Sequence, residues 1–564
     1  MNTILKQLQL LKDAELHSNI CKVCDKALTL VDQKSEANNA VFKLQVTLYY
    51  AEALFLTHQH SRAENLYREA LQLRKDQLLK TKNSSNKMDN NLLSNMPSDV
   101  DLKYQIYLCC AALKQKQAAG EILQSIAPRH RTPKINMALG NIYKELGMDR
   151  AAVASYKEVL RECPMALEAA ENLLKLGIKS IEVNSLMLQV TTDIGWLNQW
   201  IKAQGQLQLK DYAGALNTYK SMEVNGLLKN NHSLLLSIAY CYLYMCEYDK
   251  AISVLQKILR LDPHLLAGRD LLSTLLAASG SKEHIRALEL LTPKIDIGLW
   301  SAEHWVVLGN YVYSLKKYDK ATYYGHQALI MDRKNVEALL LKANALLQIK
   351  KYQESITHCS EALQICNMRY DIYKCLVECY IQTNRLREAE SMAINACNQL
   401  NFSAQGYCLH AFVLLKDPMA SSKTIRRTLE KAVSLDKSDS TNALYMLVEF
   451  LQREQQHEQA SQLLLKRLQA REPTSRLHQL LGDCFINLKM DDEAFDHYNV
   501  ALNLDPTNQR ATEGLNNIGR SLTMSKRDSY YTCVGGETSY CNSQGTNSLD
   551  LDGEAESDTE SGTW

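Results

Sequence analysis

A spacing of 34 residues between small side chains is the feature of this sequence that most restricts its fold. Ala328, Ala362 and Ala396 follow one another at this step, and the same step separates Tyr318 from Tyr352. A fixed period of this length indicates a supersecondary unit that recurs along the chain. The sequence therefore predicts stacked repeats instead of one compact core.

Within each unit, small and large residues alternate in a recognisable order. Units begin near residues 302, 336 and 370, a fourth near 404 gains two residues around Lys416–Ser422, and related units begin near 44, 100, 133, 196, 232, 441 and 475. The order of Leu, Gly, Tyr, Ala and Pro resembles the tetratricopeptide repeat, in which two antiparallel helices pack through small residues at the eighth and twentieth positions. We therefore expect an all-α tetratricopeptide-repeat superhelix, an α-solenoid of helix-turn-helix units.

Composition supports helix and disfavours several functional classes. The 564 residues include only 22 Gly and 9 Pro, and 64 basic residues balance 63 acidic ones. Without a basic block we expect no nucleic-acid binding. Without an apolar run of 18 residues we expect no membrane span. Since the N-terminal stretch lacks the core of a signal peptide, we expect a cytosolic or nuclear protein.

The domain organisation follows from where the period holds. We expect N-terminal helices with the first repeat at 1–75, a flexible loop at 76–101, repeats with irregular helices at 102–300, and regular repeats at 301–519. The irregular stretches are 167–195 and 266–301, the second with a turn at Ser279-Gly280-Ser281. Residues 520–564 are rich in Ser, Thr, Gly and acids and should form a disordered acidic tail.

No pattern in the sequence provides a catalytic site. Phosphate-binding, dinucleotide-binding, zinc-protease and serine-hydrolase motifs are all missing. Cys21-x-x-Cys24 lacks a second ligand pair, and His58-x-His60 and His358-Cys359 are better explained by turn exposure and packing. We therefore expect neither an enzyme nor a cofactor.

The remaining possibility is a surface that binds proteins. The second, fifth, ninth and twelfth positions of helix A face the groove in repeats of this type, and Asn recurs at the ninth position, where it could hydrogen-bond an extended peptide or merely solvate the groove. The groove candidates are Asn141, Asn310, Tyr313, Leu340, Asn344, Leu347, Lys374 and Glu378.

The first repeat could also form a dimer contact. It begins the array without an obviously polar capping helix, and an exposed apolar face there would need a partner. The dimer candidates are Leu44, Val46, Leu48 and Leu54. The alternative is that the preceding helix, from Thr3 to Leu30, covers this face.

Longer stretches carry a narrower resemblance. RTPKINMALGNIYKELG (131–147), ASYKEVLRECPMALEAA (154–170) and LHQLLGDCFINLKMDDEAFDHYNVALNLDPTNQ (477–509) resemble the subunit 7 family of the anaphase-promoting complex (cyclosome). The resemblance implies a non-catalytic scaffold in a multisubunit cullin-RING ubiquitin ligase that drives mitotic progression. It also implies a homodimer, contacts with sister tetratricopeptide subunits and coactivators, and a location in the nucleus and cytoplasm, with the spindle possible.

A second hypothesis is a chaperone co-factor that clamps a C-terminal carboxylate. Such adaptors use a Lys and an Asn on helix A, and here Val306 stands where the lysine would be needed beside Asn310.

Overall fold

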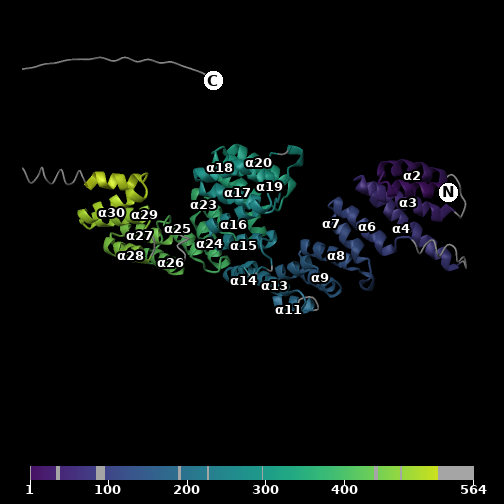
Figure 1. The fold of residues 1–564 in the computed structure, drawn as a ribbon, viewed down its shortest axis with the longest axis horizontal. Helices are drawn as coiled ribbons and strands as arrows, with labels where there is room; N and C mark the ends of the chain where they lie inside the picture. Colours follow the sequence, from purple (N-terminus) through teal and green to yellow (C-terminus); the bar gives the residue numbers. More distant parts are fainter. Residues whose placement is uncertain are drawn as a thin grey trace, which may run out of the picture. The chain divides into compact units, whose positions relative to one another are not determined.

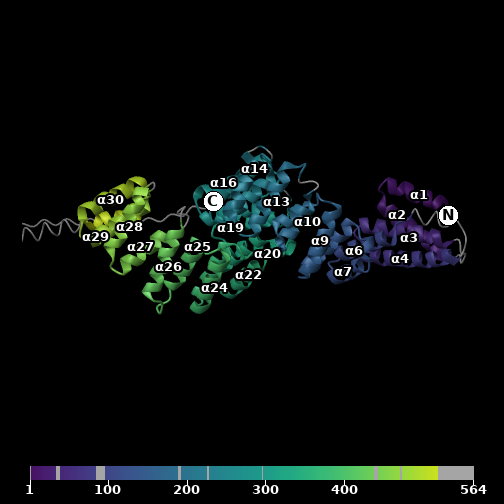
Figure 2. The ribbon, with the colours of Figure 1, turned by 90° about the horizontal axis from the view of Figure 1, so that it is seen from below.

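Antiparallel helix pairs make up the protein, whose computed structural model describes residues 2–32, 39–83, 96–188, 192–224, 226, 228–294, 296–436, 442–470 and 473–518. Across these ranges the regular structure is helical, without a strand. The chain divides into two units, Met1–Asp417 and Pro418–Trp564 (Figure 1, Figure 2). The described residues confirm the all-α tetratricopeptide-repeat prediction, and the predicted tail at 520–564 lies outside them.

The first unit runs from α1 to α25. Its N-terminal helices are α1 (Asn2–Asp13), α2 (His17–Asp32), α3 (Asn39–Leu56), α4 (His60–Asn83), α6 (Asp99–Ala112) and α7 (Lys116–Gln124), followed by the 3-10 turn η1 (Pro128–His130). Next come α8 (Pro133–Glu145), α9 (Asp149–Glu162), α10 (Leu167–Lys175), α11 (Ser180–Leu186), α13 (Gly195–Gln208), α14 (Tyr212–Val224), α15 (His232–Tyr244) and α16 (Tyr248–Leu261). The rest are α17 (Arg269–Ser279), α18 (Lys282–Leu291), η2 (Ile297–Leu299), α19 (Ala302–Ser314), α20 (Tyr318–Met331), α21 (Val336–Gln348), α22 (Tyr352–Ile365), α23 (Tyr370–Gln382), α24 (Leu386–Gln399) and α25 (Ala404–Leu414).

The second unit contains a shorter series of helices of the same kind. It contains α26 (Ser422–Leu435), α27 (Ala443–Arg453), α28 (His457–Ala470), α29 (Ser475–Asn487) and α30 (Asp491–Leu504), and residues 509–518 are again helical.

The regular repeats keep the predicted period in their helix starts. The A helices α19, α21 and α23 begin at Ala302, Val336 and Tyr370, which are 34 residues apart. Proline ends several B helices as expected, since it has no N–H to donate and clashes with the preceding turn. Pro164, for example, stands two residues after α9 ends at Glu162.

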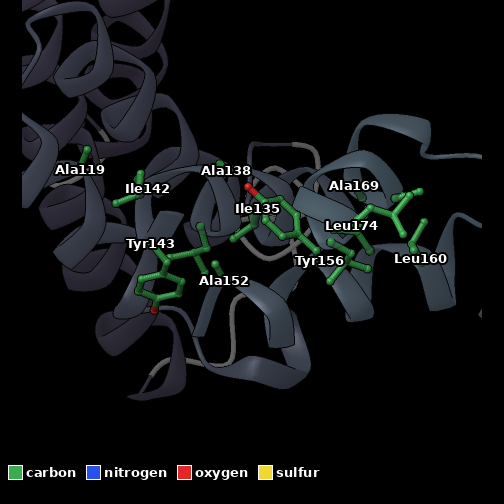
Figure 3. Close-up of a cluster of buried hydrophobic side chains, with 14 of the residues drawn as sticks. Ala119, Ile135, Ala138, Ile142, Tyr143, Ala152, Tyr156, Leu160, Ala169 and Leu174 are labelled. Carbon is green, nitrogen blue, oxygen red and sulfur yellow. The ribbon is translucent and has the colours of Figure 1, made fainter. Parts of the chain in front are cut away.

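Small residues lie where two helices of a repeat approach. Ala321, Ala389 and Ala494 are fully buried, as the repeat predicts. Gly140 on α8 shows the reason most directly, because a Cβ built there would lie 2.5 Å from Cε1 of the Tyr156 ring on α9. Figure 3 shows Tyr156 among the buried apolar side chains of this cluster. The helices can therefore pack at this distance only if position 140 has no side chain.

A left-handed residue recurs in the turn between the two helices of a repeat. It is Lys316 (φ 61°), Lys350 (φ 68°) and Asn384 (φ 57°) in three successive repeats. The same conformation at Gly280 (φ 64°) confirms the turn expected at Ser279-Gly280-Ser281. A residue with positive φ reverses the chain within a few positions, so that the second helix runs antiparallel to the first.

The expected loop at 76–101 was too wide at both ends. Helix α4 continues through Asn83 and α6 already begins at Asp99, so only the middle of the predicted loop, 84–95, lies outside the described residues. The sequence DQLLKTKN contains Leu, Lys and Gln, which favour helix, and this preference prevails over the nearby Asn and Ser residues. The irregular stretches at 167–195 and 266–301 contain shortened helices of 7 to 11 residues.

Candidate protein-binding surfaces

Two of the predicted groove asparagines are engaged inside the chain. The Asn141 side-chain oxygen accepts hydrogen bonds from the Tyr156 hydroxyl at 2.7 Å and from the Asn172 amide at 3.5 Å. Asn310 is buried, and its amide donates to the hydroxyls of Ser273 at 2.8 Å and Thr274 at 3.1 Å. Their amide groups therefore join neighbouring repeats, and a peptide would have to compete with those bonds.

Three apolar or aromatic groove candidates pack against other helices. Leu340 is 1% exposed within the core formed by α21, α22 and α23, so its prediction as a groove residue was wrong. Leu347 is half-buried against the same core. Tyr313 packs on the cluster that contains Ala321, and burial raises the pKa of its hydroxyl to about 12.

The accessible groove candidates lie on α21 and α23, which are in contact. Asn344 is half-buried and Lys374 is exposed. Burial raises the pKa of the half-buried Glu378 carboxyl, and the nearby Lys374 partly offsets this effect. These three side chains are the part of the predicted groove that can still present polar groups to a partner.

The four dimer candidates do not form an exposed face. Leu44, Val46 and Leu54 are almost completely buried within the single chain, and Leu48 is half-buried. Helices α1 and α2 both contact α3, while Leu44 packs against Ala70 and its neighbours. The prediction that these residues await a second subunit was wrong. The alternative, that the segment from Thr3 to Leu30 covers this face, agrees with the structure, except that the segment forms two helices instead of one.

Sequence reasoning missed a buried charged network inside the first unit. Arg369, at the start of α23, is 4% exposed and donates hydrogen bonds to Glu337 on α21 and, at 3.2 Å, to Asp371. Asp371 also accepts a hydrogen bond from the Tyr248 hydroxyl on α16 at 2.8 Å. Asp270 on α17 accepts a hydrogen bond from Asn335 at 3.3 Å. Its pKa is raised to about 6 by burial and by the nearby Glu337.

Tyrosines surround this network. The rings of Tyr240 and Tyr244 stack at 6.2 Å between centroids, and Tyr212 lies 5.2 Å from Tyr244. Burial raises the pKa of the Tyr240, Tyr244 and Tyr248 hydroxyls. The only signal in the sequence was the spacing of these three tyrosines, which are four residues apart.

A different surface exposes apolar side chains near η2. Ile297 and Leu299 are 65% and 74% exposed. The neighbouring Trp300 ring meets Trp305 edge-on at 4.7 Å, and Trp305 stacks on Tyr324 at 5.9 Å. Exposed apolar residues beside a rigid aromatic group are typical of protein-protein contacts.

Metal-binding clusters and membrane-spanning helices are absent from the described residues. They contain no group of three or more His, Cys, Asp or Glu side chains placed to hold a metal ion. Among the helices of the described ranges, none combines the length and apolar character needed to cross a bilayer. Burial raises the pKa of the Cys24 thiol to about 12, so this member of the Cys21-x-x-Cys24 pair is not a reactive thiolate.

Comparison with known proteins gives a consistent result. Tetratricopeptide repeat family models match residues 306–367 and, for a second model, residues 133–164 and 232–265. Anaphase-promoting complex subunit 7 of Homo sapiens is 36% identical over 509 residues, which cover 89% of this chain and 89% of that protein. The Arabidopsis thaliana protein of the same name is 25% identical and covers 85% of this chain.

A solved structure supports the fold. The crystal structure of the APC/C hetero-tetramer Cut9–Hcn1 matches with a TM-score of 0.55 over 91% of this chain and 95% of that chain. Because the sequence identity is 16%, this similarity supports the fold alone.

Proposed function

The chain belongs to the anaphase-promoting complex subunit 7 family, and on this premise we propose that it is a non-catalytic scaffold subunit of that ubiquitin ligase, acting through protein docking. The observation that carries the proposal is similarity at 36% identity over 89% of the chain. The solenoid of helix pairs agrees with it, because stacked repeats present long surfaces for other proteins. In this role the chain supports the ubiquitination of cell-cycle proteins and mitotic progression.

The partners that follow are other tetratricopeptide subunits of the complex and its coactivators. Purification of the tagged full chain from dividing cells, followed by mass spectrometry, should recover these subunits together with a cullin-RING pair. Their clean absence would refute the proposal. Fluorescence imaging of the same tagged chain should place it in the nucleus and cytoplasm.

The apolar surface near η2 provides a sharper version of this experiment. Ile297→Asp and Leu299→Asp change exposed side chains and should leave the fold intact, while reducing recovery of a neighbouring subunit. Ile181→Asp is a matched control, since Ile181 is 81% exposed on α11. Equal recovery with all three variants would exclude the η2 surface as a docking site and leave the scaffold proposal standing.

We also propose a homodimer, through a different face from the one first expected. With Leu44, Val46 and Leu54 covered, Leu10 on α1 at 59% and Leu30 on α2 at 56% are the most exposed large apolar residues among the described parts of α1, α2 and α3. Sedimentation of the full chain at micromolar concentration should give a dimer, and Leu10→Glu with Leu30→Glu should give a monomer. A monomeric parent chain would refute the dimer.

The chaperone co-factor hypothesis has less support. Val306 is fully buried at the position where a lysine would be needed, and the Asn310 amide already donates to Ser273 and Thr274. A calorimetric titration with an acidic C-terminal peptide should therefore show no binding.

A further inference from the structure

Residues far apart in the sequence meet inside the first unit. The Tyr248 hydroxyl on α16 donates to Asp371 on α23, 123 residues later. Lys210 lies between α13 and α14, and its ammonium donates to the backbone oxygen of Gln399 at 2.9 Å and to its side-chain oxygen at 3.1 Å. The Asn401 amide in turn donates to the backbone oxygen of Lys210 at 3.1 Å.

These contacts are unusual for an array of repeats. In a plain solenoid each repeat contacts only its neighbours, about one repeat length away in the sequence. Here the separations are 123, 189 and 191 residues. The segment from α13 to α24 therefore forms a turn whose two ends touch.

The inner side of this turn is filled by the chain itself. Tyr248 and Asp371 connect α16 to α23, Arg369 connects Asp371 to Glu337 on α21, and Asn335 connects α21 to Asp270 on α17. Since α17 contacts α16, the connections run around the inside of the turn. The tyrosines of α15 lie against the same charges.

The closed arrangement leaves part of its polar groups unsatisfied. One oxygen of the buried Glu337 carboxylate and the Nε of the buried Arg369 have no hydrogen-bond partner. An unpaired buried polar atom costs free energy, and a hydrogen bond exchanged for one to water contributes only modestly to stability. The contacts across the turn are a few side-chain hydrogen bonds, each of which contributes only modestly to stability, so they can break and reform while the helix pairs stay folded.

We propose that Lys210, Tyr248, Asp371, Gln399 and Asn401 form a clasp, which is a set of hydrogen bonds that holds the two ends of this turn together and keeps its concave face closed. While the clasp is made, Tyr248, Arg369 and Asp371 pack together between α16 and α23 on the inner side of the turn. Access of a partner segment to this part of the concave face requires the clasp to open. The proposal concerns the conformation of the chain alone and stands independently of the ligase to which the chain belongs.

Hydrogen exchange of the full chain, followed by mass spectrometry, tests the clasp. Lys210→Ala with Tyr248→Phe removes two contacts across the turn and leaves the Arg369–Glu337 pair in place. The matched control, Lys257→Ala with Tyr156→Phe, removes the same side-chain groups from contacts with Glu223 and Asn141, which join the same or adjacent repeats.

The two double variants should differ in how much of the chain shows accelerated amide exchange. The clasp variant should accelerate amide exchange by roughly tenfold on both sides of the turn, in α13–α16 and in α23–α24, because each lost contact had joined the two ends and only the Asn401 contact remains. The control should act only near its own substitutions. Acceleration by the clasp variant confined to the mutated helices would overturn the proposal.

A distance measurement tests whether the two ends of the turn touch, even if the clasp variant does not fold. Leu209 and Phe402 are exposed and adjoin Lys210 and Asn401, so spin labels at Leu209→Cys and Phe402→Cys report on the clasp directly. The labelled chain carries serine in place of the exposed Cys163 and of Cys533 and Cys541. A short, narrow distance distribution supports the closed turn, and a long or broad one in this otherwise native chain overturns it.

Discussion

Replacing Gly140 by alanine should destabilise the repeat formed by α8 and α9. The new Cβ would lie 2.5 Å from Cε1 and 2.8 Å from both Cδ1 and Cζ of the Tyr156 ring. The ring cannot easily move away, because Tyr156 is fully buried and its hydroxyl donates to Asn141 at 2.7 Å. Overpacking of a core costs about 1–3 kcal/mol. Alanine gains about 1 kcal/mol over glycine within a helix, so the net loss should be up to about 2 kcal/mol.

Gly120→Ala is the matched comparison for this prediction. Its Cβ would meet Ile142 Cγ2 at 3.4 Å, an ordinary contact, so the helix preference should dominate and α7 should become more stable by up to about 1 kcal/mol. Amide exchange in α7, α8 and α9 of the full chain is a suitable assay, because arrays of repeats need not unfold in one step.

Two results are expected if Gly140 is small because of the Tyr156 ring. The two substitutions must change protection in opposite directions, and Gly140→Ala combined with Tyr156→Leu must cost less than the sum of the two single changes. Equal signs, or simple additivity, would refute the claim that Gly140 is small in order to admit the Tyr156 ring.

Three further outcomes follow from burial and titration. Ala389→Leu should destabilise the α23–α24 pair by about 1–3 kcal/mol, since Ala389 is fully buried, and exchange of the amides in these helices would reveal it. In the second unit, Nδ1 of His478 lies 3.0 Å from Nδ1 of His497, and burial lowers the pKa of both side chains. Protonation therefore favours the unfolded chain, so the stability of this unit should be at its full value above about pH 6.5 and should decline as the pH falls below that value. Urea melts at pH 7 and pH 5 would measure the decline, and His497→Gln should make it smaller. A thiol reagent should modify the exposed Cys163 of the native chain long before the buried Cys241, because burial raises the pKa of the Cys241 thiol to about 12. Peptide mapping would give the order of modification, and earlier modification of Cys241 would contradict the prediction.

The sequence was sufficient to predict the helix pairs because their determinants are local. A small residue every 34 positions, a proline after helix B and the apolar pattern all act within one repeat or between neighbours. Val336 and Tyr370 therefore begin helices where the period requires. The end of α4 was missed for a local reason too, since helix-favouring residues outweighed the polar character of the segment.

The inner surface could not be predicted in the same way. Which groove positions remain accessible depends on the small rotation that each repeat adds, and this rotation accumulates over many repeats. Leu340 occupies a nominal groove position and is nevertheless buried, while Arg369 is buried near Tyr240 and Tyr244 of α15, more than 100 residues earlier in the chain. The N-terminal face was uncertain for a related reason, because a pattern of apolar residues does not identify the element that covers them.

The left-handed residues at the helix turns have a consequence for how short a working fragment can be. Lys316, Lys350 and Asn384 each hold a conformation that costs a residue with a side chain roughly 1 kcal/mol. An excised single repeat carries this penalty without the neighbours that offset it. Truncation from either end should therefore leave a stable protein down to some minimum number of repeats and then abolish folding abruptly.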